Sequence, residues 1–113
     1  MQPAPTDLAH TAFAPVFAAL GDPTRLTIVA TLSDGTARSI SELTTGSEMT
    51  RQAMTKHLKV LEAAGLVASE RSGRETRFAF CPDRLDDARD ALDAVAARWD
   101  AALARLKAFA ERD

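Results

Sequence analysis

The spacing of apolar residues predicts a chain made mostly of helices. From residue 7 to 20 the apolar side chains recur at helical intervals, and a second such stretch runs from Pro23 to about Ser33. Pro15 would disturb the first helix, so its regular part should begin near Ala14. Shorter helices are expected at residues 39–44 and 50–63, separated by a brief turn that contains Gly46.

A last helix, expected from about residue 83 to 111, carries the clearest pattern of the chain. Apolar side chains occupy positions a and d of four heptads, from Leu85 to Phe109. Such a helix would be about 42 Å long, which is longer than a domain of this size is wide. Part of its apolar stripe must therefore pack outside its own protomer, most economically on the first or last helix of a second copy. The predicted dimer contacts are Phe13, Phe17, Leu92, Val95, Trp99, Leu103, Leu106 and Phe109.

Two strand-like stretches, residues 66–71 and 76–81, flank a turn that contains Gly73. Phe78 and Phe80 fall on one face of the second strand and should rest on the helices, because a two-stranded ribbon alone is marginal in water. The tip of the hairpin would present cations to a phosphate backbone, although a solvated hairpin is an alternative. The cations concerned are Arg71, Arg74 and Arg77.

The helix that follows Thr50 has two unlike faces. One face is largely apolar and includes His57, for which a packed, hydrogen-bonded role is favoured over a ligand role. The other face has no acidic residue and consists of side chains that bond to base edges and phosphates. Preceded by a short helix and a tight turn, it is predicted to be the recognition helix of a helix-turn-helix. The predicted DNA contacts on it are Thr50, Arg51, Gln52, Thr55, Lys56 and Lys59.

Composition and charge fit this interpretation. The 113 residues suffice for one domain, expected over residues 7–113 after a proline-rich, disordered tail at residues 1–6. The net charge is −2, yet residues 47–77 hold six basic against four acidic side chains, the local excess that phosphate binding needs. A single cysteine, no signal peptide and no apolar run of about 20 residues indicate a cytoplasmic protein without a membrane span.

Residues that could carry catalysis are missing from the sequence. It contains no paired histidine, no glycine-rich phosphate loop and no convincing pair of carboxylates. We therefore expect neither an enzyme nor a bound cofactor. The fold expected is mainly α with a small β-hairpin: a winged helix-turn-helix of about five helices, dimeric through its first and last helices.

Four segments, in this order and spacing, resemble the ArsR/SmtB family of bacterial winged-helix repressors. They are residues 19–26 (ALGDPTRL), 40–43 (ISEL), 55–67 (TKHLKVLEAAGLV) and 73–75 (GRE). The resemblance implies a homodimer built from the first and last helices, with the fourth helix in the major groove and the hairpin as wing. It also implies binding to an inverted-repeat operator, usually as a repressor.

The known metal sites of that family are not matched. Ser39 and Ser41 stand where one family site has a Cys-x-Cys, and hydroxyls are poor ligands for soft metals. A second family site needs histidines on the last helix, which has none. No metal site is expected, and the chain resembles a subgroup that lacks these sites. Two alternatives stay open: a ligand- or thiol-responsive sensor that uses Cys81 or an inter-subunit cleft, and a winged helix used only for protein interaction.

Overall fold

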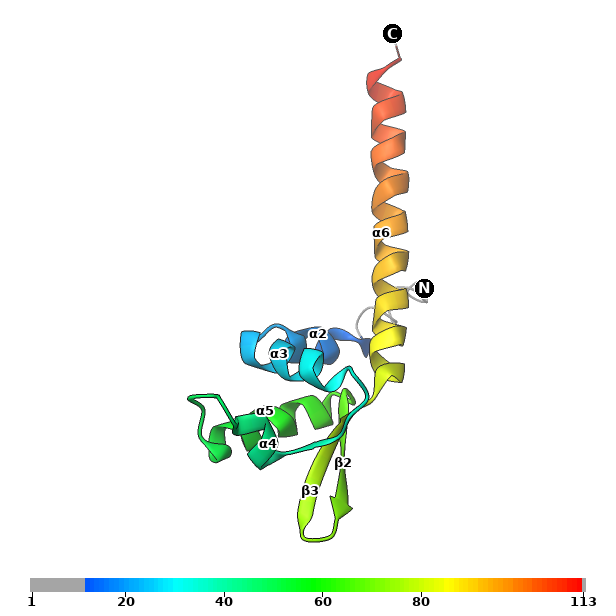
Figure 1. The fold of residues 1–113 in the computed structure, drawn as a ribbon. Helices are drawn as coiled ribbons and strands as arrows, with labels where there is room; N and C mark the ends of the chain where they lie inside the picture. Colours follow the sequence, from blue (N-terminus) through cyan, green and yellow to red (C-terminus); the bar gives the residue numbers. More distant parts are fainter. Residues whose placement is uncertain (1–11, 113) are drawn as a thin grey trace.

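The computed structural model describes residues 12–112. Figure 1 shows that helices α2 to α5 and a small sheet form one body, which we call the head, and that α6 extends away from it. The predicted tail at residues 1–6 and the start of the first helix lie outside the described residues. In chain order the elements are α2 (Ala14–Leu20), α3 (Pro23–Leu32), β1 (Arg38–Ser39), α4 (Ile40–Thr44), α5 (Arg51–Ala63), β2 (Val67–Ser72), β3 (Glu75–Phe80) and α6 (Pro82–Ala110).

Side chains at the helix ends explain where the central helices begin and stop. Asp22 accepts a hydrogen bond from the backbone N–H of Arg25 at 3.0 Å and caps α3. At the other end of α5, Gly65 adopts a φ of +79°, a conformation that favours glycine. The N–H of the next residue, Leu66, then donates to the carbonyl of Leu61 at 3.0 Å, which closes the helix and turns the chain into β2.

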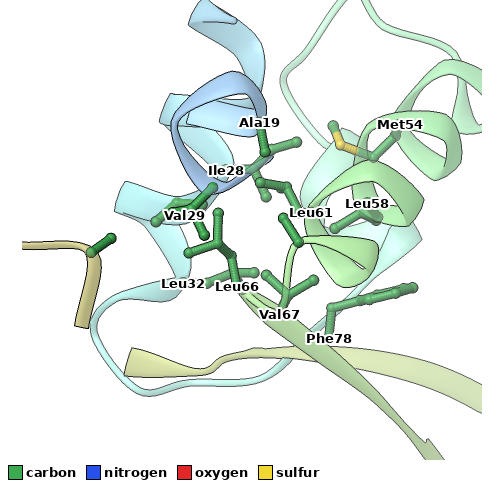
Figure 2. Packing of buried hydrophobic residues seen from close by; sticks show 13 residues of the cluster. Ala19, Ile28, Val29, Leu32, Met54, Leu58, Leu61, Leu66, Val67 and Phe78 are labelled. Carbon is green, nitrogen blue, oxygen red and sulfur yellow. The ribbon is translucent and has the colours of Figure 1, made fainter. Parts of the chain in front are cut away.

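The core of the head lies between α3, α5 and the sheet (Figure 2). Leu32, Leu58 and Leu61 are fully buried, and Leu66 joins them from the start of β2. Phe78 closes the core from the sheet at 6% exposure. Burial of each such side chain stabilises the fold by roughly 1.5–3 kcal/mol, so this contact fixes α5 against the sheet.

The sheet has three strands, where the sequence predicted a two-stranded hairpin. The order is β1-β3-β2, and both pairings are antiparallel. Strand β1 aligns Arg38 with Phe78 and Ser39 with Arg77. This places β3 at the centre, with β1 on its other edge. The predicted burial of Phe78 and packing of Phe80 against the helices are confirmed.

Helix α6 belongs to the head over its first third only. Ala88 and Ala91 are buried there, whereas the large apolar side chains further along are mainly exposed. The molecule measures 71 × 32 × 22 Å, and Figure 1 shows that α6 accounts for the long dimension. We call residues 92–110 the distal half of α6. Its exposed large apolar side chains are Leu92 at 51%, Trp99 at 65%, Leu103 at 53%, Leu106 at 63% and Phe109 at 71%.

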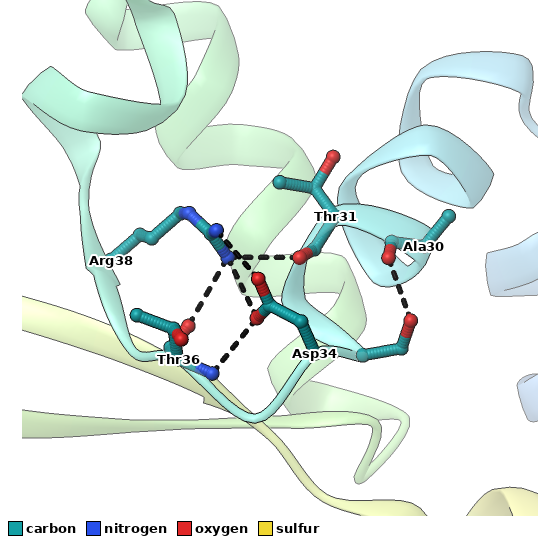
Figure 3. A network of polar contacts seen from close by, with 6 residues as sticks. Ala30, Thr31, Asp34, Thr36 and Arg38 are labelled. Carbon is teal, nitrogen blue, oxygen red and sulfur yellow. Dashed lines mark hydrogen bonds and ion pairs between the residues drawn. The ribbon is translucent and has the colours of Figure 1, made fainter.

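A polar network closes the loop between α3 and β1 (Figure 3). Arg38 donates to both carboxylate oxygens of Asp34, at 2.8 and 3.1 Å, and to the carbonyl of Thr31 at 2.8 Å. The backbone N–H of Thr36 donates to the same carboxylate at 2.9 Å. The hydrogen bond from Arg38, more than that from Thr36, lowers the pKa of Asp34 from 3.8 to about 2. The carboxylate thus holds β1 in place through Arg38.

This network predicts a contribution of Asp34 to stability that depends on pH. Because the pKa of Asp34 is lower in the folded than in the unfolded chain, the contribution is complete above about pH 4 and is lost as the pH falls towards 2. Replacing Asp34 by asparagine should lower the urea midpoint at pH 7 and leave it unchanged near pH 2. Urea unfolding measured at several pH values tests this, and an equal difference between the two proteins at every pH would contradict it.

Candidate DNA-binding surface

Helix α5 presents the predicted recognition face to solvent. Its inner face buries Met54, Leu58 and Leu61, which are 0–4% exposed. The outer face is cationic and contains no acid. The hydroxyl of Thr55 donates to the carbonyl of Arg51 at 2.8 Å, so this half-buried side chain lies close to the helix backbone. The remaining outer side chains, Arg51, Gln52, Lys56 and Lys59, are exposed.

Thr50 has a structural task besides its predicted DNA contact. Its hydroxyl accepts a hydrogen bond from the backbone N–H of Ala53 at 3.1 Å and caps α5. The cap satisfies a donor that would otherwise be unpaired at the start of the helix. Thr50 therefore fixes where the recognition helix begins.

His57 joins α5 to the start of α3. Its Nδ1 lies 3.3 Å from Nη1 of Arg25 and 3.8 Å from the Asp22 carboxylate. Arg25 also donates through Nε to the carbonyl of Ala19 at 2.7 Å. The backbone hydrogen bond from Arg25, together with the charges of Arg25 and His57, lowers the pKa of Asp22. The predictions of a packed, hydrogen-bonded His57 and of a structural contact for Arg25 are confirmed.

The three predicted wing arginines lie in different surroundings. Arg71 and Arg74 are exposed and have no ion pair with any residue from 12 to 112. Arg77 is half-buried, and its Nη2 lies 3.3 Å from Glu75 and 3.8 Å from Glu42. Arg77 thus fastens β3 to α4. The geometry favours Arg71 and Arg74 over Arg77 as phosphate contacts.

Comparison with known proteins identifies the class of this fold. A sequence family described as a helix-turn-helix domain matches residues 20–70. The HTH-type transcriptional repressor SmtB of Mycobacterium tuberculosis is 40% identical over 78 residues, which cover 69% of this chain and 56% of that protein. An ArsR-like transcriptional regulator from Rhodococcus sp. RHA1 is 40% identical and matches with a TM-score of 0.79, over 91% of this chain and 96% of that one. The chain belongs to the ArsR/SmtB family.

Proteins of the ArsR/SmtB family are transcriptional regulators with a DNA-binding winged helix-turn-helix, and they are not enzymes. A further structural match is the homodimeric winged helix-turn-helix DNA-binding domain of a possible ArsR-family regulator from Mycobacterium bovis. It is 26% identical with a TM-score of 0.64, over 87% of this chain and 89% of that one. The predicted fold class and family are thereby confirmed.

The family's metal-binding positions on α4 serve a different purpose in this ArsR/SmtB protein. Ser39 is buried and forms a capping box with Glu42: its hydroxyl accepts from the Glu42 N–H at 3.1 Å, and the Glu42 carboxylate accepts from the Ser39 N–H at 3.1 Å. Within residues 12–112 no three histidine, cysteine or acidic side chains are grouped to hold a metal ion. Ser39 thus stabilises the start of α4.

The remaining predicted features lie away from the cationic face. Cys81 is half-buried between β3 and α6, and its backbone N–H donates to the carbonyl of Leu66 at 2.9 Å. Phe13 and Phe17 pack partly against their own core, and Arg84 lies over the Phe13 ring at 4.9 Å. None of the helices within residues 12–112 combines the length and apolar character needed to cross a membrane.

Proposed function

We propose that this protein is a homodimeric repressor that binds an inverted-repeat operator. The observation that carries the proposal is the outer face of α5, which is exposed, cationic and free of acids. A helix in a helix-turn-helix reads base edges with residues near its N-terminus. Gln52 and Lys56 have this position, and amide and ammonium groups pair with adenine and guanine edges. Lys59, Arg71 and Arg74 would bind phosphates.

The exposed stripe on the distal half of α6 supports dimerisation. Side chains such as Trp99 and Phe109 are the kind that soluble proteins cover with a partner. A second copy provides the same apolar stripe, and a two-fold axis would present two α5 helices to one face of DNA. Half-sites are expected about 34–36 Å apart, one helical turn, or a multiple of it.

The direction of regulation is inferred from a relative. The 40% identical SmtB protein is a transcriptional repressor. We therefore propose that the dimer represses by occupying an operator that overlaps a promoter, and that it acts in the cytoplasm, where that DNA lies. The effector, if one exists, is not specified by the features described above.

Replacing Gln52 and Lys56 together by alanine should reduce affinity for the operator about 10- to 100-fold, because each base contact contributes roughly 1–3 kcal/mol. The operator would be selected from random DNA with the unmodified protein and binding measured by gel retardation. Affinity for unrelated DNA should fall much less.

Arg112→Ala is the matched control, since it also removes one cation but lies beyond the end of α6. It should bind the operator like the unmodified protein. Unchanged operator binding by the double variant would overturn the assignment of α5. Failure of the unmodified protein to bind any DNA at low salt would favour a winged helix used for protein interaction.

A further inference from the structure

A small cleft lies between the start of α4, the start of α5 and the turn of the β2–β3 hairpin. Its volume is about 270 Å³, and its lining includes Ser41, Arg51, Arg74, Glu75 and Thr76. Pockets for drug-sized ligands occupy roughly 300–1,000 Å³, so this cleft suits a group rather than a whole effector molecule. It is the place where the recognition helix and the wing come together.

Two arginines from different elements share this cleft without a counter-charge of their own. Arg51 is the first residue of α5, and Arg74 follows Gly73 in the hairpin turn, where Gly73 has a φ of +64°. Neither guanidinium donates a hydrogen bond to, or forms an ion pair with, a side chain or carbonyl within residues 12–112. By contrast, Arg25, Arg38 and Arg77 are each held by acceptors of the chain itself.

The other polar groups of the cleft suit an anion. Glu75 is the acidic side chain in the lining, and Arg77 lies 3.3 Å from its carboxylate, which compensates its charge. The hydroxyls of Ser41 and Thr76 also reach the cleft and can donate hydrogen bonds. Two planar guanidinium groups and two hydroxyls match a tetrahedral oxyanion, for which arginine is well suited.

We propose that this cleft takes one phosphate group of the DNA backbone, held between Arg51 and Arg74. This inference rests on the proposed function, and it changes the role of one residue. Arg51, predicted from sequence among the DNA contacts of the recognition helix, acts here on the backbone, and base reading is left to Gln52, Thr55 and Lys56. A phosphate bound by both arginines fixes the wing relative to α5, so that backbone binding sets the depth of the helix in the groove.

The number of phosphates involved can be measured from the salt dependence of binding. Each neutralised phosphate contributes about 0.9 to the slope of log affinity against log salt. If both arginines share one phosphate, Arg51→Ala combined with Arg74→Ala should lower the slope by about 0.9, and each single change should lower it by less. A decrease of about 1.8 in the double variant would mean two separate phosphates and would overturn the clamp.

Arg71→Ala is the control variant on the same hairpin, since Arg71 is exposed but does not line the cleft. Its effect should add fully to that of Arg51→Ala, whereas the effects of Arg51→Ala and Arg74→Ala should not add. Operator and unrelated DNA should lose affinity equally in the cleft variants. A loss confined to operator DNA with one particular base pair would show that Arg51 reads a base and would contradict the proposal.

Chemically modified DNA locates the group. A neutral methylphosphonate at one position of each half-site should weaken binding of the unmodified protein about tenfold or more and leave the double variant unaffected. Different positions for the two single variants would overturn the clamp. Absence of DNA binding by the unmodified protein would overturn the proposed function as well, which separates the two failures.

A free anion is the other source of the same chemistry. Inorganic phosphate, titrated at constant ionic strength, should displace the operator no better than sulfate does. A saturable phosphate site that is lost in the Arg51→Ala, Arg74→Ala variant and that releases DNA would assign the cleft to a dissolved effector. That result would overturn the assignment to backbone phosphate.

Discussion

Replacing Leu103 and Leu106 by glutamate should convert the protein into a monomer and reduce its operator affinity by at least about 1,000-fold, to the level of non-specific binding. The two side chains are 53% and 63% exposed in one chain, so the charges disturb no core of the protomer. In the proposed dimer they would be buried against a second apolar stripe, where unpaired carboxylates are strongly unfavourable. Sedimentation and gel retardation measure the two effects.

The matched control places the same two charges on the opposite side of the same helix. Ala97 and Ala104 are exposed and lie outside the apolar stripe. Their replacement by glutamate should leave both the dimer and its affinity for the operator unchanged. A dimer that survives the changes at Leu103 and Leu106 would overturn the role of the distal half of α6. A monomer that keeps full operator affinity would overturn the need for two recognition helices.

Replacing Leu61 by alanine should lower the free energy of unfolding by about 2–5 kcal/mol. The side chain is fully buried and belongs to the contact between α5 and the rest of the core (Figure 2). Removing it leaves a cavity that the surrounding helices fill only in part. Since small domains have roughly 5–15 kcal/mol in total, a large share of the stability would be lost. Urea unfolding followed by circular dichroism measures the change.

Val60→Ala is the appropriate comparison, because Val60 is the preceding residue of the same helix and is 42% exposed. It should alter the free energy of unfolding by about 0.5 kcal/mol or less. Equal losses for the two variants would mean that α5 is held by features other than its buried face.

Much of the fold could be predicted because its signals are local. Thr50, Asp22 and Ser39 are capping residues immediately before helical stretches, and the structure uses all three as caps. The heptad pattern likewise predicted a long last helix, which runs from Pro82 to Ala110. These patterns are repeated over several residues of one element, so they are visible without knowledge of the neighbouring elements.

The features that escaped prediction depend on contacts between distant residues. Strand β1 has only two residues, Arg38 and Ser39, which is too short for an alternating pattern, and it exists because β3 offers a free edge. The pairing of Arg77 with Glu42 follows from that edge. In the same way, the sequence shows Arg51 and Arg74 as members of two separate elements, and only the folded chain places both on one cleft.

The uncovered length of α6 has a consequence for how the amount of protein controls regulation. If the active form is a pair of chains, its concentration at low expression rises with the square of the chain concentration. Doubling synthesis would then raise the amount of DNA-competent protein about fourfold. Trp99, Leu106 and Phe109, which lie far from any groove contact, would therefore set the expression level at which repression begins.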